Sequence, residues 1–347
     1  MAMERKTYLF GVHHLRAFAI VNIMFVHLWV VPPSAVGAGT ASLIDMFRES
    51  LFHDSTVYFL FISGFLFYYL SENFSIRRYF VSKLSFVFSP YLIYTLFLTI
   101  YSGIALIRDG HISSFLSRLL SNVLLGKAVL PYWYIPFIMT IFLISPLLLK
   151  VPKKAYPVIA IAAFVLPLSG TRTYSDISIG QYVFFLPVYV LGVCSAVYYS
   201  EMLLLVKRFK KALLAIVVAS LVLVFVFIGR PYLGPFNIYE ALQYLNKITV
   251  TFLALSWLTN REPFRIRILD LLAEYSFPLY FSHAIANVTI SRMLYSSMSR
   301  LVTPSSSLVV VVPLSILFVV CRIALTLLVC MTAKRLLGKY SRYFIGT

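Results

Sequence analysis

The sequence has 347 residues, of which 61% are hydrophobic and only 12% are charged, and its mean hydropathy is +0.89. This composition excludes a soluble globular domain, because such apolar stretches would face water with nothing to pack against. The 30 Lys and Arg residues outnumber the 12 Asp and Glu residues, which gives a formal net charge of +18. Because no soluble basic domain accompanies this charge, it indicates contact with anionic membrane lipids and argues against nucleic-acid binding.

Ten apolar segments are candidates for crossing a bilayer, for which about 20 residues are needed. The first retains Arg16, Asn22 and His27, which a cleaved signal peptide has no reason to carry, so we expect it to remain as a helix. The ninth contains Pro278 and several polar residues, and we therefore expect it to line an interior. The segments are 15–33, 55–71, 84–107, 130–149, 155–169, 181–199, 212–229, 241–258, 274–291 and 308–330.

The distribution of Lys and Arg among the loops indicates an orientation. With a cytoplasmic N-terminus, the inside segments hold about twice as many of these residues as the outside segments, as the positive-inside rule requires. We therefore predict an all-α polytopic membrane helix bundle with about ten transmembrane helices and cytoplasmic N- and C-termini. No repeat, linker or soluble domain interrupts it, so residues 1–347 are expected to form a single transmembrane domain.

Ionisable side chains inside a bilayer are costly and therefore mark a polar interior. Arg16 and His27 are eleven residues apart, about three turns, so they share one face of the first helix and lie ~16 Å apart along its axis. Taken alone, Arg16 is more typical of an anchor whose side chain reaches the membrane interface than of a functional residue. His27 taken alone is as typical of a hydrogen bond between helices as of a functional group.

The other candidates are equally open on sequence grounds. His283 follows Pro278 and fits a packing histidine beside a kink, and Arg322 either reaches the interface or faces an anion in the interior. Asp54 beside His53 is more typical of a solvated pair in a loop than of a catalytic pair. The three cysteines lie in apolar runs and no Cys/His cluster has metal-ligand spacing, so we expect no metal site. An acyltransferase, a transporter or a structural membrane protein could contain these residues.

Four segments, in order, resemble the motifs of the membrane acyltransferase 3 family. Arg16 and His27 match its Arg-x10-His pattern, and residues 59–66 (FLFISGFL) resemble its FF-x-x-SGF helix, with Asp54 near its acidic position. Residues 133–137 (WYIPF) resemble its WYLP segment, and residues 275–283 (YSFPLYFSH) resemble its late YSFPIYLLH helix. The motifs span nearly the whole chain, and the ten-helix architecture of the family agrees with the predicted count.

The resemblance implies an O-acyltransferase that moves an acyl group, most often acetyl, from a cytoplasmic acyl-CoA to a hydroxyl. The acceptors it implies are envelope or extracellular glycans, such as lipopolysaccharide or another polysaccharide, or a lipid-linked sugar. Acyl-CoA is then a substrate, no cofactor is bound permanently, and the bacterial inner membrane is the expected location. We expect the stand-alone form without an SGNH-type domain. The alternative is a transporter or flippase for a glycan or lipid-linked sugar, which would use a similar polar interior.

Donor binding is where the sequence departs from the family. The basic Arg-x-x-Arg element before the third helix is incomplete, because only Lys83 lies close to the expected place before Pro90. We expect Arg77, Arg78 and Lys83 to stand in for it and to hold the donor's phosphates.

Acyl transfer needs a base, an oxyanion stabiliser and an anchor for the donor. His27 is the predicted base, since an imidazole titrates near neutral pH, or it is the nucleophile of an acyl-histidine intermediate. Arg16 would hold a phosphate or the pantetheine arm of the donor. The arm's reach is comparable to the ~16 Å between the two residues, which predicts transfer on the outer face of the membrane.

The remaining predicted site residues are expected to support the base, the oxyanion stabiliser and the donor anchor. Ser63, with Gly64, would allow the second helix to approach the first closely. His283 and Tyr280, about one turn apart, would orient the substrate or donate to the oxyanion. Trp133 and Asp54 are assigned to substrate binding by their places in the motifs.

Overall fold

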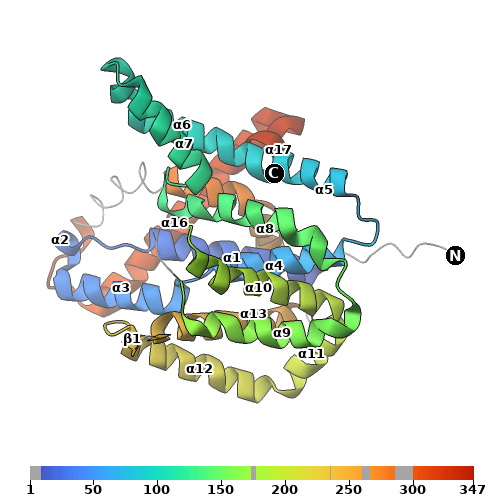
Figure 1. Ribbon diagram of the computed structural model, residues 1–347. Coiled ribbons are helices and arrows are strands. Elements are labelled where there is room, and N and C mark those ends of the chain that lie inside the picture. Colours follow the sequence, from blue (N-terminus) through green and yellow to red (C-terminus); the bar gives the residue numbers. More distant parts are fainter. Residues whose placement is uncertain (1–8, 173–176, 235, 260–265, 286–299) are drawn as a thin grey trace.

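The computed structural model describes residues 9–172, 177–234, 236–259, 266–285 and 300–347, and these are almost entirely helical (Figure 1). The strands among them form one short antiparallel pair, β1 (Tyr232–Leu233) with β2 (Phe236–Asn237). Residues 276–285 are also helical. The other α-helices are α1 (Phe10–Leu28), α2 (Pro33–Val36), α3 (Ala38–Phe52), α4 (Thr56–Tyr69), α5 (Ile76–Lys83), α6 (Ser89–Arg108), α7 (Ile112–Leu125), α8 (Tyr134–Leu148), α9 (Tyr156–Val165), α10 (Ile179–Val197), α11 (Tyr199–Arg208), α12 (Lys210–Phe227), α13 (Ile238–Thr259), α14 (Arg267–Glu274), α16 (Leu308–Leu337) and α17 (Ser341–Phe344).

Among the described residues, seven helical stretches are long and apolar enough to cross a membrane. This confirms the predicted all-α, multi-pass class, whereas the count of ten and the cytoplasmic placement of both termini remain predictions. The stretches are Phe10–Leu28, Ala38–Tyr69, Ile76–Arg108, Leu130–Leu148, Ile179–Val197, Lys210–Phe227 and Leu308–Phe344.

Three predicted segments differ from these seven. The segment 155–169 forms α9, of 10 residues, which is only ~15 Å long, followed by a 3-10 turn at Leu166–Ser169. The segment 241–258 lies in α13, which has 22 residues but buries Glu240 and Lys247, and such side chains lower its hydropathy. Of the segment 274–291, residues 286–291 lie outside the described part of the chain.

The helix Ile76–Arg108 is continuous but not uniform. A π-helical turn at Leu84–Phe88 joins α5 to α6. Such turns carry one residue more than an α-helical turn and often occur at functional sites. α5 packs against α8, whereas α6 packs against α7.

α1 and α4 lie in the middle of the bundle, with α8 above them and α10 and α13 below in the view of Figure 1. One hydrophobic cluster extends from Val12 on α1 to Cys330 on α16. The outer helices, such as α12, expose apolar side chains, including Val218 and Val226. An apolar outer surface is expected where helices face lipid rather than water.

Two glycines bring α4 and α10 into backbone contact. A Cβ on Gly64 would overlap with the carbonyl oxygen of Tyr189, and a Cβ on Gly192 would overlap with that of Phe61. Small residues allow this approach between membrane helices. The close contact predicted between this part of α4 and the first helix is therefore made to α10 instead.

Replacing Gly64 with Ala is expected to lower the free energy of unfolding by about 1–3 kcal/mol, because the added methyl group meets rigid backbone. Thermal unfolding of the purified protein in detergent measures the change. Gly39→Ala is the control, because none of the described residues lies within 4 Å of a Cβ at Gly39. Equal melting temperatures for the two variants would contradict the packing argument.

Candidate functional site

Two cavities lie along α1, and the predicted site residues divide between them. The larger has a volume of about 770 Å³ and the smaller about 540 Å³. The larger is lined by Arg16, Phe59, Ile62, Ser63, Leu66, Phe67, Leu70, Glu72, Asn73, Phe74, Ser75, Arg78, Tyr79, Ser82, Lys83 and Phe277. The smaller is lined by Ile23, Val26, His27, Val30, Arg48, Glu49, His53, Asp54, Ser55, Thr56, Phe59, Val129, Leu130, Pro131, Trp133, Tyr134, Arg172, Tyr280, His283 and Ala284.

The larger cavity is basic. Among the described residues that line it, Arg16, Arg78 and Lys83 face one carboxylate, Glu72. The guanidinium of Arg16 donates to Ser276 Oγ at 3.0 Å, which ties α1 to the helix at 276–285. Three cations around one opening can hold a polyanion such as a phosphate group. The structure therefore brings together Arg16 and two of the three cations predicted to hold the donor.

Arg77 is separated from this group although it precedes Arg78 in the sequence. It is an exposed residue of α5 and lies outside the lining of the larger cavity. Neighbouring residues of a helix point about 100° apart, and in α5 it is Arg78 that faces the cavity. Its role in donor binding remains a prediction without this support.

The smaller cavity gathers five of the predicted residues, Asp54, Trp133, Tyr280 and the two histidines. The rings of His27 and His283 are stacked, with centroids 5.2 Å apart and planes at 30°. His27 lies in the last turn of α1, and His283 comes from the helix at 276–285. The sequence identified both histidines, but only the fold shows that they form a pair.

The hydrogen bonds of His283 define its tautomer. Its Nδ1 donates to the backbone carbonyl of Tyr280 at 2.7 Å, so in the neutral ring the lone pair is on Nε2. That Nε2 is buried and has no hydrogen-bond partner among the described residues. Neutral His283 can therefore accept a proton or a hydrogen bond, and it can donate to an oxyanion only once it is protonated.

Tyrosines join the helix at 276–285 to the chain before α8. The hydroxyl of Tyr280 donates to the carbonyl of Pro131, and that of Tyr132 donates to the carbonyl of Phe281 at 2.8 Å. Because the Tyr280 hydroxyl is engaged in this way, the structure favours an orienting role for Tyr280 over oxyanion donation. The same contacts fix Trp133 and His283 relative to each other.

The end of α1 is held by α16. The guanidinium of Arg322 donates to the carbonyl of Leu28 at 2.8 Å, and Trp29 Nε1 donates to Ser315 Oγ at 2.8 Å. A cation at a helix C-terminus satisfies carbonyls that lack a partner within the helix. Arg322 is 2% exposed, so it does not reach the interface, which was one of the two alternatives left open by the sequence. Its bond to Leu28 supports the turn that carries His27.

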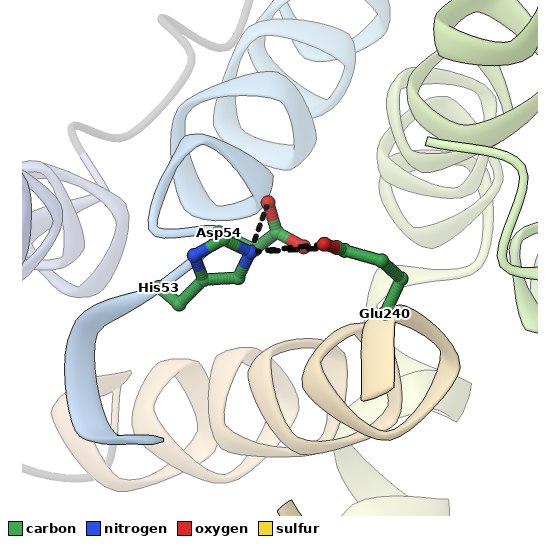
Figure 2. A group of neighbouring side chains, drawn as sticks. All are labelled: His53, Asp54 and Glu240. Carbon is green, nitrogen blue, oxygen red and sulfur yellow. Dashed lines mark hydrogen bonds and ion pairs between the residues drawn. The ribbon is translucent and has the colours of Figure 1, made fainter. Parts of the chain in front are cut away.

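A buried ionic cluster forms one wall of the smaller cavity. His53, Asp54 and Glu240 point toward one another (Figure 2), and His53 Nε2 lies 3.2 Å from Glu240 Oε1. Arg172 Nη1 pairs with Asp54 and lies 3.5 Å from Glu240 Oε2. His53 and Asp54 are 5% and 4% exposed, so the solvated loop pair expected from the sequence is wrong.

Sequence reasoning did not identify two members of this cluster. Glu240 falls at the edge of a predicted helix and Arg172 in a predicted loop, 68 residues apart, and no motif joins them. The nearest signal was the acidic position assigned to Asp54, which has a φ of 58°. This left-handed conformation is uncommon for a residue with a side chain and turns the chain from α3 into α4.

The same cluster has the spacing of a metal site. One donor atom each from His53, Asp54 and Glu240 lies within 4.8 Å of the others, and nitrogen and carboxylate oxygen are common metal ligands. However, Arg172 pairs with both carboxylates and so supplies a positive charge at that place. A metal ion would have to displace this guanidinium, so the residues fit an ion network better than a metal site.

Replacing Arg172 with Met is expected to lower the free energy of unfolding by about 3–5 kcal/mol, because it removes the guanidinium that pairs with two buried carboxylates. Thermal unfolding in detergent is again the measurement. Arg118→Met is the matched control, since Arg118 is exposed and its partner among the described residues is the carbonyl of Ser102, at 3.4 Å. If both variants unfold at the wild-type temperature, the cluster does not stabilise the fold.

A family model described as an acyltransferase domain matches residues 9–335, which is nearly the whole chain. No curated protein and no solved structure matches the sequence. The matched range includes both cavities and every residue assigned to them above.

Proposed function

The chain belongs to the membrane acyltransferase 3 family, and from this membership we propose that it transfers an acetyl group from a cytoplasmic acyl-CoA to a hydroxyl of an envelope glycan. What supports this reaction is the division of the polar residues between two cavities. One cavity has the cations that a CoA donor requires, and the other has a pair of histidines able to handle a proton. Both extend along the same helix, α1.

The larger cavity would bind the donor. Arg16, Arg78 and Lys83 would contact the phosphates of CoA, because guanidinium and ammonium groups form strong charge-assisted hydrogen bonds with phosphate. The pantetheine arm would then extend along α1, where ~16 Å separates Arg16 from His27. The thioester would thereby reach the smaller cavity while the nucleotide stays at the basic end.

The smaller cavity would bind the acceptor and perform the chemistry. His27 would take the proton of the acceptor hydroxyl while the hydroxyl oxygen attacks the thioester carbonyl carbon. The new C–O bond forms, the C–S bond breaks, and the proton passes from the imidazole to the leaving thiolate. His283 Nε2, which has an available lone pair, would orient the hydroxyl or share its proton. Trp133 would pack against the sugar.

His27→Ala is expected to reduce transfer of labelled acetyl from acetyl-CoA to envelope glycan by ~10²–10⁴-fold, because the reaction loses its base. The assay uses membranes that contain matched amounts of each variant. His111→Ala serves as the control, since His111 is exposed and lies outside both cavities. Equal label with wild type and His27→Ala would contradict the role of His27. A lack of label with every protein and several acyl-CoA donors would contradict the acyltransferase and favour transport.

Arg78→Ala is expected to raise the KM for acyl-CoA by ~10-fold or more, because it removes a charged contact to phosphate that is worth about 1.5–3 kcal/mol. The value of kcat should change less, since Arg78 is remote from the histidines. Arg77→Ala is the matched control, with the same charge removed from the adjacent, exposed position. If both variants raise KM equally, the larger cavity is not the phosphate site.

A further inference from the structure

Phe59 lines both cavities. One turn away along α4 in one direction, Ser63 lines only the larger cavity, and in the other direction Thr56 lines only the smaller one. The cavities therefore meet at the level of Phe59, between the end of α1 that carries Arg16 and the end that carries His27. Among the described residues, Phe59 is the side chain shared by the two cavities, so a group that moves from one to the other at this level passes it.

The surroundings of Phe59 differ from those of its neighbours. Within the described residues its ring takes part in no ring–ring contact, whereas Phe61 packs against Phe252 and Phe67 packs against Phe74 and Tyr79. Phe59 is nevertheless only 8% exposed. The ring of Phe59 therefore separates the two cavities, and aromatic packing does not require it there.

We propose that Phe59 is a specificity-determining residue whose ring closes the passage between the cavities and sets the largest acyl group that reaches the histidines. This rests on the proposed function, since the acyl group leads the pantetheine arm toward His27. A short acyl group passes the ring, whereas each further methylene meets it and is discriminated by ~10–200-fold. The same ring keeps water of the larger cavity away from the thioester.

Phe59→Ala tests the proposal through the choice of acyl group. The ratio of butyryl to acetyl transfer is expected to rise by ~10-fold or more. Phe61→Ala removes the same ring from the same helix, but Phe61 lines neither cavity, so its ratio should stay at the wild-type value. An unchanged ratio in an active Phe59→Ala protein overturns the proposal. If Phe59→Ala does not fold, Phe59→Leu is used and is expected to raise the ratio less.

A second measurement does not depend on transfer and so separates a failure of this proposal from a failure of the proposed function. Val26 lines only the smaller cavity and is replaced by Cys in a protein whose native cysteines are removed. A membrane-impermeant thiol reagent is applied to sealed vesicles of each orientation. With Phe59 present, Cys at position 26 should react in one orientation only, and with Phe59→Ala it should react in both. Reaction in both orientations with Phe59 present, or in one only with Phe59→Ala, shows that the ring does not separate the cavities.

Discussion

A polar group that enters the hydrocarbon core must find its partner within the protein, and in this chain that requirement fixes α1 at both of its ends. Near the first end, His14 lies 3.0 Å from Asp270 and Arg16 donates to Ser276. At the other end, Arg322 donates to the carbonyl of Leu28. These partners lie far away in the sequence, on α14, the helix at 276–285 and α16. The positions of Arg16 and His27, and hence of the two cavities, depend on these contacts.

α13 plays a similar part for the turn between α3 and α4. Lys247 donates to the carbonyl of Leu51 at 2.8 Å, and Gln243 donates to that of Glu49 at 2.8 Å. Gln243, Lys247 and Glu240 thus form a polar face on a buried helix. Gln243 and Lys247 hold carbonyl groups of α3, and Glu240 pairs with His53 and Arg172 beside the smaller cavity. The polar residues that lower its hydropathy are thus the ones that position Asp54.

The sequence predicted the features that depend on local geometry. Helical spacing placed Arg16 and His27 on one face of one helix, and composition identified the membrane class. Motif resemblance assigned Trp133, Tyr280 and His283 to a site, and the structure places all three at one cavity.

Contacts that join distant residues to backbone or to a loop could not be predicted. The Arg322–Leu28 bond spans 294 residues and ends on a carbonyl group that every residue has, and the pairing of Arg172 with Glu240 has no periodic signature. The choice between Arg77 and Arg78 depended on the rotation of α5 about its axis, which a helix of eight residues does not reveal without its neighbours.

The π-helical turn between α5 and α6 has a consequence for how the proposed donor site could change over time. One residue more or fewer in a helix rotates everything beyond it by about 100°. The turn therefore sets the angular phase between the cations of α5 and the surface of α6 that packs against α7. Removing a single codon there would rotate one half of the helix relative to the other and present a different set of side chains to the larger cavity. Under the proposed function, donor preference could thus diverge through a change of register, without substitution of any residue that lines the larger cavity.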